Sequence, residues 1–210
     1  MAVLLPGKFV YLAHPHTGSS ATVLAMQDAF PEALDIRPHH MSYSELMCPG
    51  NITRMSQRRQ RVWKGGRPVT GKLPELRPEA AIARVTGDEV RFCVVRNPYD
   101  FFVSCYLRQK QNTNSPNMEH FAASFKRPPF VKEGRLWYLL DECDEVFLYE
   151  ELQESFDALS TRLGIAKISL ERKNATPDKE PWESYYTPKA FEIVNNRFGK
   201  EIEKFYELRH

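Results

Sequence analysis

Residues 89–108 read EVRFCVVRNPYDFFVSCYLR and are the most informative segment for the fold. Its first part, residues 89–95, is mostly apolar and rich in β-branched residues, which predicts a central strand. Residues 99–109 predict a helix, and Pro98 is well placed to start it because proline suits the first helical turn. The stretch therefore predicts a strand that passes directly into a helix.

A candidate anion site lies at this junction. Arg96 follows the strand, so we expect its side chain at the carboxyl edge of the sheet, where open α/β sheets bind ligands. Ser104 lies two turns along the helix. A guanidinium offers phosphate a planar fork of donors, and a serine hydroxyl adds a compact partner. An ordinary junction with an Asp100–Arg108 pair on the helix would explain Asp100, but not the joint presence of Arg96 and Ser104.

Strands and helices alternate along the rest of the chain. Further strands are predicted at residues 8–13, 34–37 and 145–149, and further helices at about 21–30, 78–85, 118–125 and 152–163. This alternation indicates the α/β class, with a single domain over residues 1–210 and a largely parallel central sheet flanked by helices. Residues 48–74 show little periodicity and are expected to form a basic loop or mobile insertion.

The last helix has the clearest pattern. Thr187 is a good N-cap, and Pro188 suits the first turn. Apolar residues then recur every three or four positions, which predicts one buried face. The residues of that face are Phe191, Val194, Phe198, Ile202 and Phe205.

Composition excludes several classes of protein. The hydrophobic fraction is 42% and the charged fraction 27%, which excludes a disordered chain. No stretch approaches the roughly 20 apolar residues of a membrane span, and the first residues lack the features of a signal peptide. We therefore expect a cytoplasmic protein that does not enter a membrane. The four cysteines are widely spaced without a Cys-x-x-Cys pair, which favours reduced thiols over disulfides or zinc.

A second candidate anion site is the loop at residues 14–20, HPHTGSS, between a predicted strand and a predicted helix. Helix N-termini bind anions because their N–H groups point outward and the helix dipole favours negative charge. Gly18 lets the backbone approach an oxyanion. Side-chain donors come from His14, His16, Thr17, Ser19 and Ser20, and one of the two serines is expected to cap a helix that begins near residue 21. A simple capped turn explains the loop about as well.

The motifs resemble those of sulfotransferases that use 3′-phosphoadenosine 5′-phosphosulfate (PAPS). Arg-Asn-Pro-x-Asp-x-x-x-Ser-x-Tyr, from Arg96, is similar to the family's 3′-phosphate-binding segment, and the loop at 14–20 falls where the family places its 5′-phosphosulfate loop. Residues 148–152, 163–165, 174–176 and 185–188 resemble later family segments in the same order. The resemblance covers nearly the whole chain and is closest to the carbohydrate-type and bacterial branch.

The resemblance implies a P-loop-like sulfotransferase fold and the transfer of a sulfonate group from PAPS to a hydroxyl, with PAP as product and no metal. Arg96 and Ser104 would hold the 3′-phosphate. The loop residues His14, Thr17, Gly18, Ser19 and Ser20 would hold the 5′-phosphosulfate. His16 stands where the family usually has a lysine that bonds the bridging oxygen, so activity is expected to be slower and sensitive to pH.

Sulfonate transfer also requires a base for the acceptor hydroxyl. Residues 40–46, HMSYSEL, resemble a family segment of the form His-x-x-x-x-Glu-Leu, so His40 is the preferred base. His39 is the reserve, and Glu45 is a weaker candidate.

The acceptor side of the site is marked by positive charge. Seven basic residues and no acidic residue lie between Glu45 and Glu75. This segment is either a solvated loop or a flexible cover that attracts an anionic acceptor or the nucleotide. The acceptor is expected to be a small molecule or a carbohydrate with a hydroxyl group. Trp63 could stack on a base, so a nucleic-acid partner remains an alternative, although a formal net charge of only +2 disfavours it.

Two other functions remain open from the sequence. A nucleotide-binding relative with weak or no transferase activity is suggested by His16. A P-loop small-molecule kinase is disfavoured because the loop lacks the Gly-x-x-x-x-Gly-Lys-Ser/Thr pattern of a Mg-ATP site.

Overall fold

The computed structural model describes residues 2–14, 16–36, 84–110, 116–125, 136–170 and 179–208. Several sequence predictions lie outside these ranges. They are the bases His39 and His40, the basic segment at 48–74, nearly all of the helix expected at 78–85, and the motif at 174–176.

The described strands form one five-stranded sheet with the order β3-β1-β2-β4-β5. The strands are β1 (Ala2–Leu5), β2 (Phe9–Leu12), β3 (Leu34–Ile36), β4 (Val90–Val95) and β5 (Glu145–Leu148). Strands β2, β4 and β5 are parallel neighbours, whereas β1 runs antiparallel to both β2 and β3. The predicted α/β class with a largely parallel sheet is confirmed.

Strand β1 was not among the predicted strands. It pairs with β2 through a tight turn at residues 6–8, in which Lys8 N donates to Leu5 O (3.0 Å) and Gly7 has φ 67°. All four residues of β1 are buried, so this short apolar segment adds an antiparallel strand inside the otherwise parallel sheet.

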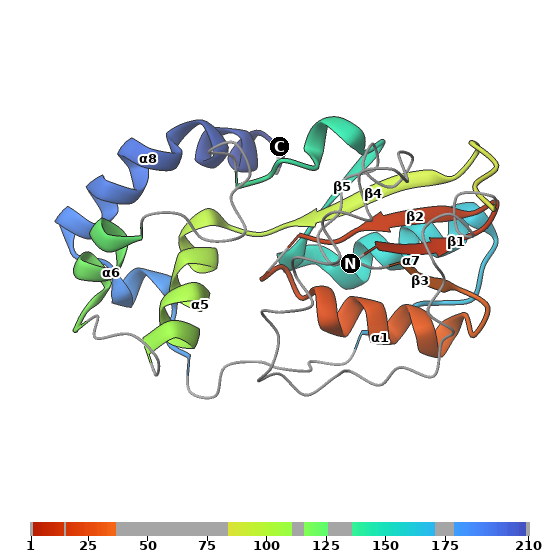
Figure 1. Ribbon diagram of the computed structural model, residues 1–210, viewed down its shortest axis with the longest axis horizontal. Coiled ribbons are helices and arrows are strands. Elements are labelled where there is room, and N and C mark those ends of the chain that lie inside the picture. Colours follow the sequence, from red (N-terminus) through yellow and green to blue (C-terminus); the bar gives the residue numbers. More distant parts are fainter. Residues whose placement is uncertain are drawn as a thin grey trace, which may run out of the picture.

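The helices are α1 (Ser19–Ala29), α5 (Pro98–Lys110), α6 (Met118–Ser124), α7 (Leu152–Leu163) and α8 (Pro188–Glu207), with 3-10 turns η1 (Leu140–Glu142), η2 (Tyr149–Glu151) and η3 (Trp182–Tyr185). Figure 1 shows α5, α6 and α8 grouped at the end of the molecule toward which β4 runs, while α1 and α7 lie beside the sheet. The predicted helices at 118–125 and 152–163 are confirmed within a residue.

The core lies on both faces of the sheet, because alternate strand residues point to opposite sides. On one face, Phe9, Tyr11 and Phe92 pack with residues of α1 and α7. On the other face, Leu12 and Val95 pack with residues of α5, α6 and α8. The sheet is therefore covered by helices on both sides, and its carboxyl edge, where β2, β4 and β5 end, connects to α1, α5 and α7.

The last helix follows its predicted pattern with one exception. Thr187 caps α8 by accepting a hydrogen bond from Ala190 N (3.1 Å), and Val194, Phe198 and the later predicted residues are buried. Phe191 was expected on the buried face but is 38% exposed. Its ring instead stacks on Tyr99 of α5, with centroids 4.7 Å apart and planes 9° from parallel.

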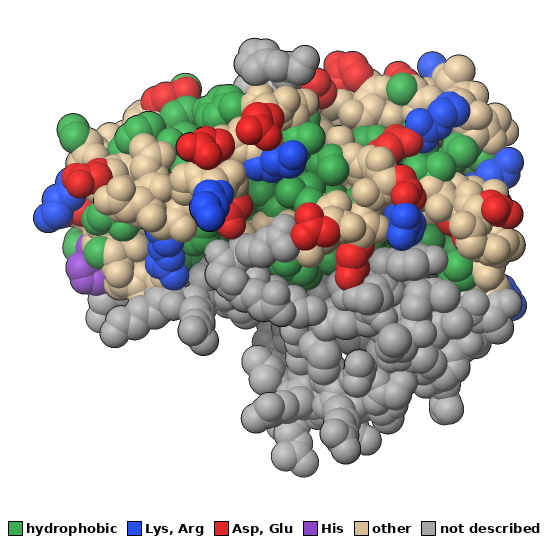
Figure 2. Space-filling view, turned by 90° about the horizontal axis from the view of Figure 1, so that it is seen from above, with side chains coloured by type: hydrophobic (Ala, Val, Ile, Leu, Met, Phe, Trp, Pro, Cys, Tyr) green, Lys and Arg blue, Asp and Glu red, His purple; other side chains and the backbone are tan. Residues whose placement is uncertain are grey.

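The surface of the described part of the chain carries mixed charge. Figure 2 shows acidic and basic side chains interspersed over the described residues of the face that it presents. No helix in the described ranges is long and apolar enough to cross a membrane.

Candidate functional site

The junction after β4 is fixed by hydrogen bonds from two directions. Asn97 caps α5, because its side-chain oxygen accepts from Tyr99 N (2.9 Å) and Asp100 N (3.4 Å). Glu150, just after β5, accepts from Asn97 N (2.9 Å). Arg96 lies between this capped helix and the end of β4, so the structure places it at the carboxyl edge of the sheet, as the sequence predicted.

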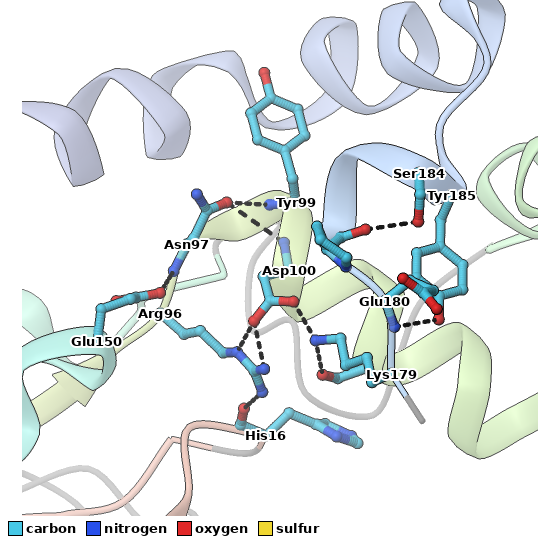
Figure 3. Close-up of polar contacts among 12 residues, drawn as sticks. His16, Arg96, Asn97, Tyr99, Asp100, Glu150, Lys179, Glu180, Ser184 and Tyr185 are labelled. Atoms are coloured by element: carbon cyan, nitrogen blue, oxygen red, sulfur yellow. Dashed lines mark hydrogen bonds and ion pairs between the residues drawn. The ribbon is translucent and has the colours of Figure 1, made fainter. Parts of the chain in front are cut away.

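Four side chains then form what we call the Asp100 cluster: Arg96, Asp100, Ser104 and Lys179. Arg96 Nε donates to Asp100 Oδ2 (2.7 Å), and Arg96 Nη2 pairs with the same oxygen. Lys179 pairs with Asp100 Oδ1 and lies 3.4 Å from Ser104 Oγ. Figure 3 shows Asp100 between the two cationic side chains. The charged side chains of the cluster are only 12–19% exposed. With two cations and one carboxylate, the cluster favours an anion.

The partners of Asp100 differ from the pair that the sequence allowed. The sequence allowed an Asp100–Arg108 pair along α5, but Asp100 pairs with Arg96, four residues before it, and with Lys179. The i,i+4 spacing of Arg96 and Asp100 could have suggested the first pair. Lys179 was missed because it lies 79 residues from Asp100 in the sequence, and no local pattern marks it.

The segment that carries Lys179 is fixed to α5 by aromatic contacts. Trp182 stacks on Tyr99 with ring centroids 4.8 Å apart and planes 12° from parallel. Tyr186 donates from its hydroxyl to Tyr99 O (3.1 Å). These contacts hold residues 179–186 against the first turns of α5, which is why Lys179 reaches Asp100.

The loop before α1 has an unusual backbone. Gly18 has φ 73° and forms the N-cap of α1 without a side-chain hydrogen bond, and His16 has φ 58°. The sequence predicted that Ser19 or Ser20 would cap a helix beginning near residue 21. That prediction is wrong, because α1 begins at Ser19 and both serines are half-buried in its first turn.

Two loop side chains face the interior. Thr17 is fully buried and donates from its hydroxyl to His14 O (2.9 Å). His14 is also fully buried, with its ring edge-on to Trp137 (centroids 5.6 Å apart) and Tyr138 (5.2 Å). The anion-binding roles predicted for His14, Thr17, Ser19 and Ser20 stay predictions.

The loop and the Asp100 cluster contact each other. Arg96 Nη1 donates to His16 O (3.2 Å), so the guanidinium bonds to the loop backbone as well as to Asp100. Tyr149, directly after β5, packs against both segments: Arg96 lies 4.5 Å from the centroid of its ring. A Cβ added at Gly18 would lie only 2.7 Å from a carbon of the same ring. The carboxyl ends of β2, β4 and β5 therefore converge on Arg96.

The ionisation of His16 differs from that of a lysine at this position. Burial, together with the charges of Arg108 and Arg96, lowers the pKa of His16 to about 4. His16 is therefore neutral near pH 7 in the free protein. Burial also lowers the pKa of Lys179, and Arg96 adds to this, although the hydrogen bond to Asp100 opposes the shift.

Comparison with known proteins gave two similar solved structures, and both are sulfotransferases. The sulfotransferase of Alicyclobacillus acidocaldarius has a TM-score of 0.43 and 13% identity, covering 98% of this chain and 96% of its own. Mouse sulfotransferase SULT7A1 in complex with PAP has a TM-score of 0.42 and 13% identity, covering 97% of this chain and 90% of its own. No protein-family model matches the sequence, and no curated protein is similar enough in sequence to count as a match.

Proposed function

We propose that this protein is a sulfotransferase that moves a sulfonate group from PAPS to a hydroxyl acceptor. The observation that carries the proposal is the convergence of two candidate anion-binding segments on Arg96. The guanidinium links the Asp100 cluster to the loop that begins α1 through its hydrogen bond to His16 O. A donor with phosphates at two positions requires two adjacent anion sites of this kind.

Arg96, Ser104 and Lys179 would bind the 3′-phosphate. Each terminal guanidinium nitrogen carries two N–H donors, so Arg96 can bond a phosphate while it keeps its bonds to Asp100 and to the loop. Lys179 lies on the side of Asp100 opposite Arg96, and its Nζ is 3.4 Å from Ser104 Oγ. The partial burial of these groups strengthens their attraction for a dianion, because water screens it less.

The loop and α1 would bind the 5′-phosphosulfate. The first turn of α1 has backbone N–H groups without a partner inside the helix, and the helix dipole favours an anion there. Gly18 suits this place, since its left-handed φ and the ring of Tyr149 both exclude a side chain. His16 would contact the oxygen that bridges phosphorus and sulfur.

The reaction is an in-line displacement. The acceptor oxygen forms a bond to sulfur as the bond between sulfur and the bridging oxygen breaks, and PAP leaves with the electron pair of that bond. His40, or His39 in reserve, would take the proton of the acceptor hydroxyl. We propose a small-molecule or carbohydrate acceptor, and the basic residues of segment 48–74 favour an anionic one.

The proposal is tested by incubating the protein with PAPS and a panel of hydroxyl acceptors and measuring sulfonated product. We expect transfer to at least one acceptor, and no transfer when Arg96 is replaced by alanine. His40→Ala should lower turnover while leaving calorimetric affinity for PAP within about twofold. A fully active His40→Ala protein would remove the base assignment, and then His39→Ala is the next variant to measure.

A second candidate is a protein that binds PAP or PAPS without efficient transfer. It is favoured by the lowered pKa of His16, which is expected to leave this position neutral where the family's lysine would carry a charge. This candidate predicts nucleotide binding but no product with any acceptor, and detectable transfer would eliminate it.

A further inference from the structure

We propose that His16 takes up a proton when a phosphate group of the nucleotide occupies the site, so that donor binding is coupled to proton uptake. This inference rests on the proposed function, because it requires that the site bind a nucleotide phosphate. A lysine at this position would already carry its proton before binding, so the coupling belongs to this chain's histidine.

The geometry keeps His16 at the site. Its carbonyl oxygen accepts from Arg96 Nη1 (3.2 Å), which joins its backbone to the cationic centre. Its ring lies edge-on to Phe101 of α5, with centroids 5.6 Å apart and planes 88° apart. Figure 3 shows the imidazole on the same side of Arg96 as Lys179. A phosphate bound by the Asp100 cluster and the loop would therefore come close to this ring.

Among the described residues, the charges of Arg108 on α5 and Arg96 after β4 act on His16. Arg96 is itself paired with Asp100 of α5, which also pairs with Lys179 before η3. Asp100 is already paired with two of the cations, so its charge is largely offset. Burial is the larger cause that disfavours the imidazolium, and the remaining positive charge of Arg108 and Arg96 adds to it, so His16 is neutral in the free protein.

A bound phosphate reverses this balance. It brings a charge of about −1.5 to −2 at pH 7 into a site where Arg96 and Arg108 otherwise oppose protonation of His16. The imidazolium is then favoured, so the pKa of His16 rises on binding and a proton enters from solvent. Because the bound form holds the extra proton, nucleotide affinity gains a contribution that grows as the pH falls toward the pKa of the free form.

The test is isothermal titration calorimetry with PAP at pH 6.5, in two buffers of different ionisation enthalpy. The difference between the two apparent binding enthalpies, divided by the difference between the two buffer ionisation enthalpies, gives the number of protons exchanged with the buffer on binding. A phosphate with a second pKa near 6 releases protons of its own, so the comparison is wild type against His16→Asn. Asparagine tolerates the left-handed backbone that residue 16 adopts. We expect the wild type to take up more protons than the variant, by up to about one per bound nucleotide.

A second measurement needs no variant. The ring proton of His16, followed by NMR over pH 5 to 8, should shift to the imidazolium value when PAP is added, while the ring signal of exposed His120 on α6 should not respond to PAP. Equal proton uptake by wild type and His16→Asn, or an unshifted His16 signal with PAP bound, would overturn the inference and leave the proposed function standing. Absence of PAP binding by the wild type would overturn both.

Discussion

The two segments that leave the carboxyl edge of the sheet differ in how their polar groups are used. After β4, side chains dominate: Asn97 caps α5, and Arg96 is paired with Asp100. After β2, the backbone dominates: Gly18 caps α1 without a side-chain hydrogen bond, and the Thr17 hydroxyl is directed inward. One segment therefore presents a positioned cation, and the other presents the N-terminus of a helix.

This difference shows how the site can hold charge before a ligand is bound. Asp100 keeps Arg96 and Lys179 together at low exposure, which would otherwise be costly for two like charges. The loop needs no such compensation, since backbone N–H groups carry only partial charge.

The largest effect is expected from removing the positioned cation. Arg96→Ala should weaken calorimetric binding of PAP by about 100-fold, because it removes charge-assisted hydrogen bonds from a partly buried site. The matched control is Arg91→Ala. Arg91 lies on β4, the strand that Arg96 follows, and also pairs with an aspartate, Asp144, but its side chain is 36% exposed and lies toward the other end of β4. PAP affinity should change less than twofold in that control, and equal losses in both variants would contradict the account.

The backbone side of the comparison is tested with Gly18→Ala. The added Cβ would require both a left-handed φ and a shift of Tyr149, so we expect a loss of about 2–3 kcal/mol in the free energy of unfolding, measured in urea. Gly7→Ala is the control, because Gly7 has φ 67° but no atom within 4 Å of the added Cβ. Its loss should be smaller, about 1 kcal/mol, from backbone strain alone. Equal losses would show that the Tyr149 contact at Gly18 is unimportant.

The role of Asp100 is tested by Asp100→Asn. Removing this carboxylate leaves Arg96 and Lys179 as neighbouring cations, so we expect a loss of about 2 kcal/mol in unfolding free energy. The control is Asp144→Asn, where the pair with Arg91 is more exposed and the loss should stay below about 1 kcal/mol. An Asp100→Asn protein as stable as the Asp144→Asn protein would argue against charge compensation in the cluster.

The smallest change in stability is expected from a substitution of Glu89, the residue before β4. Its side chain links the β1–β2 turn to residues 86–87 by hydrogen bonds. Its carboxylate accepts from Gly7 N, Thr86 N and Gly87 N, each at 2.9 Å. Burial raises the pKa of Glu89, but these hydrogen bonds lower it more, so the net shift is downward. The stabilisation is therefore complete above the unfolded pKa of 4.5 and is lost as pH falls through the folded value. In Glu89→Gln, the free energy of unfolding measured in urea should fall less between pH 6 and pH 3 than it does in the wild type, and an unchanged pH profile would contradict this.

Local patterns in the sequence predicted most of the fold. The strand and helix at 89–108, the Thr187 cap and the helix at 152–163 depend on neighbouring residues, and the structure agrees with each. Phe191 was misplaced because its partner, Tyr99, lies on another helix. The exposure of Phe191 depends on stacking against Tyr99, a tertiary contact that helical periodicity cannot predict.

The site was less predictable from sequence for the same reason. Arg96 and Ser104 are close in sequence, and the structure brings them into one cluster. Lys179 joins that cluster only because Trp182 and Tyr186 hold its segment against α5. The neutral state of His16 depends on burial and on two arginines from outside its loop, so the motif alone could not give it.

In the proposed function, Arg96 recognises a 3′-phosphate next to the loop that begins α1. The most direct test measures calorimetric affinities of PAP and of adenosine 5′-phosphate, which lacks the 3′-phosphate, for the wild type and for Arg96→Ala. We predict that the wild type prefers PAP by about 100-fold and that Arg96→Ala loses nearly all of this preference, since the lost contacts are charge-assisted hydrogen bonds. A wild type that binds both nucleotides equally, or a variant that keeps the preference, would contradict the account.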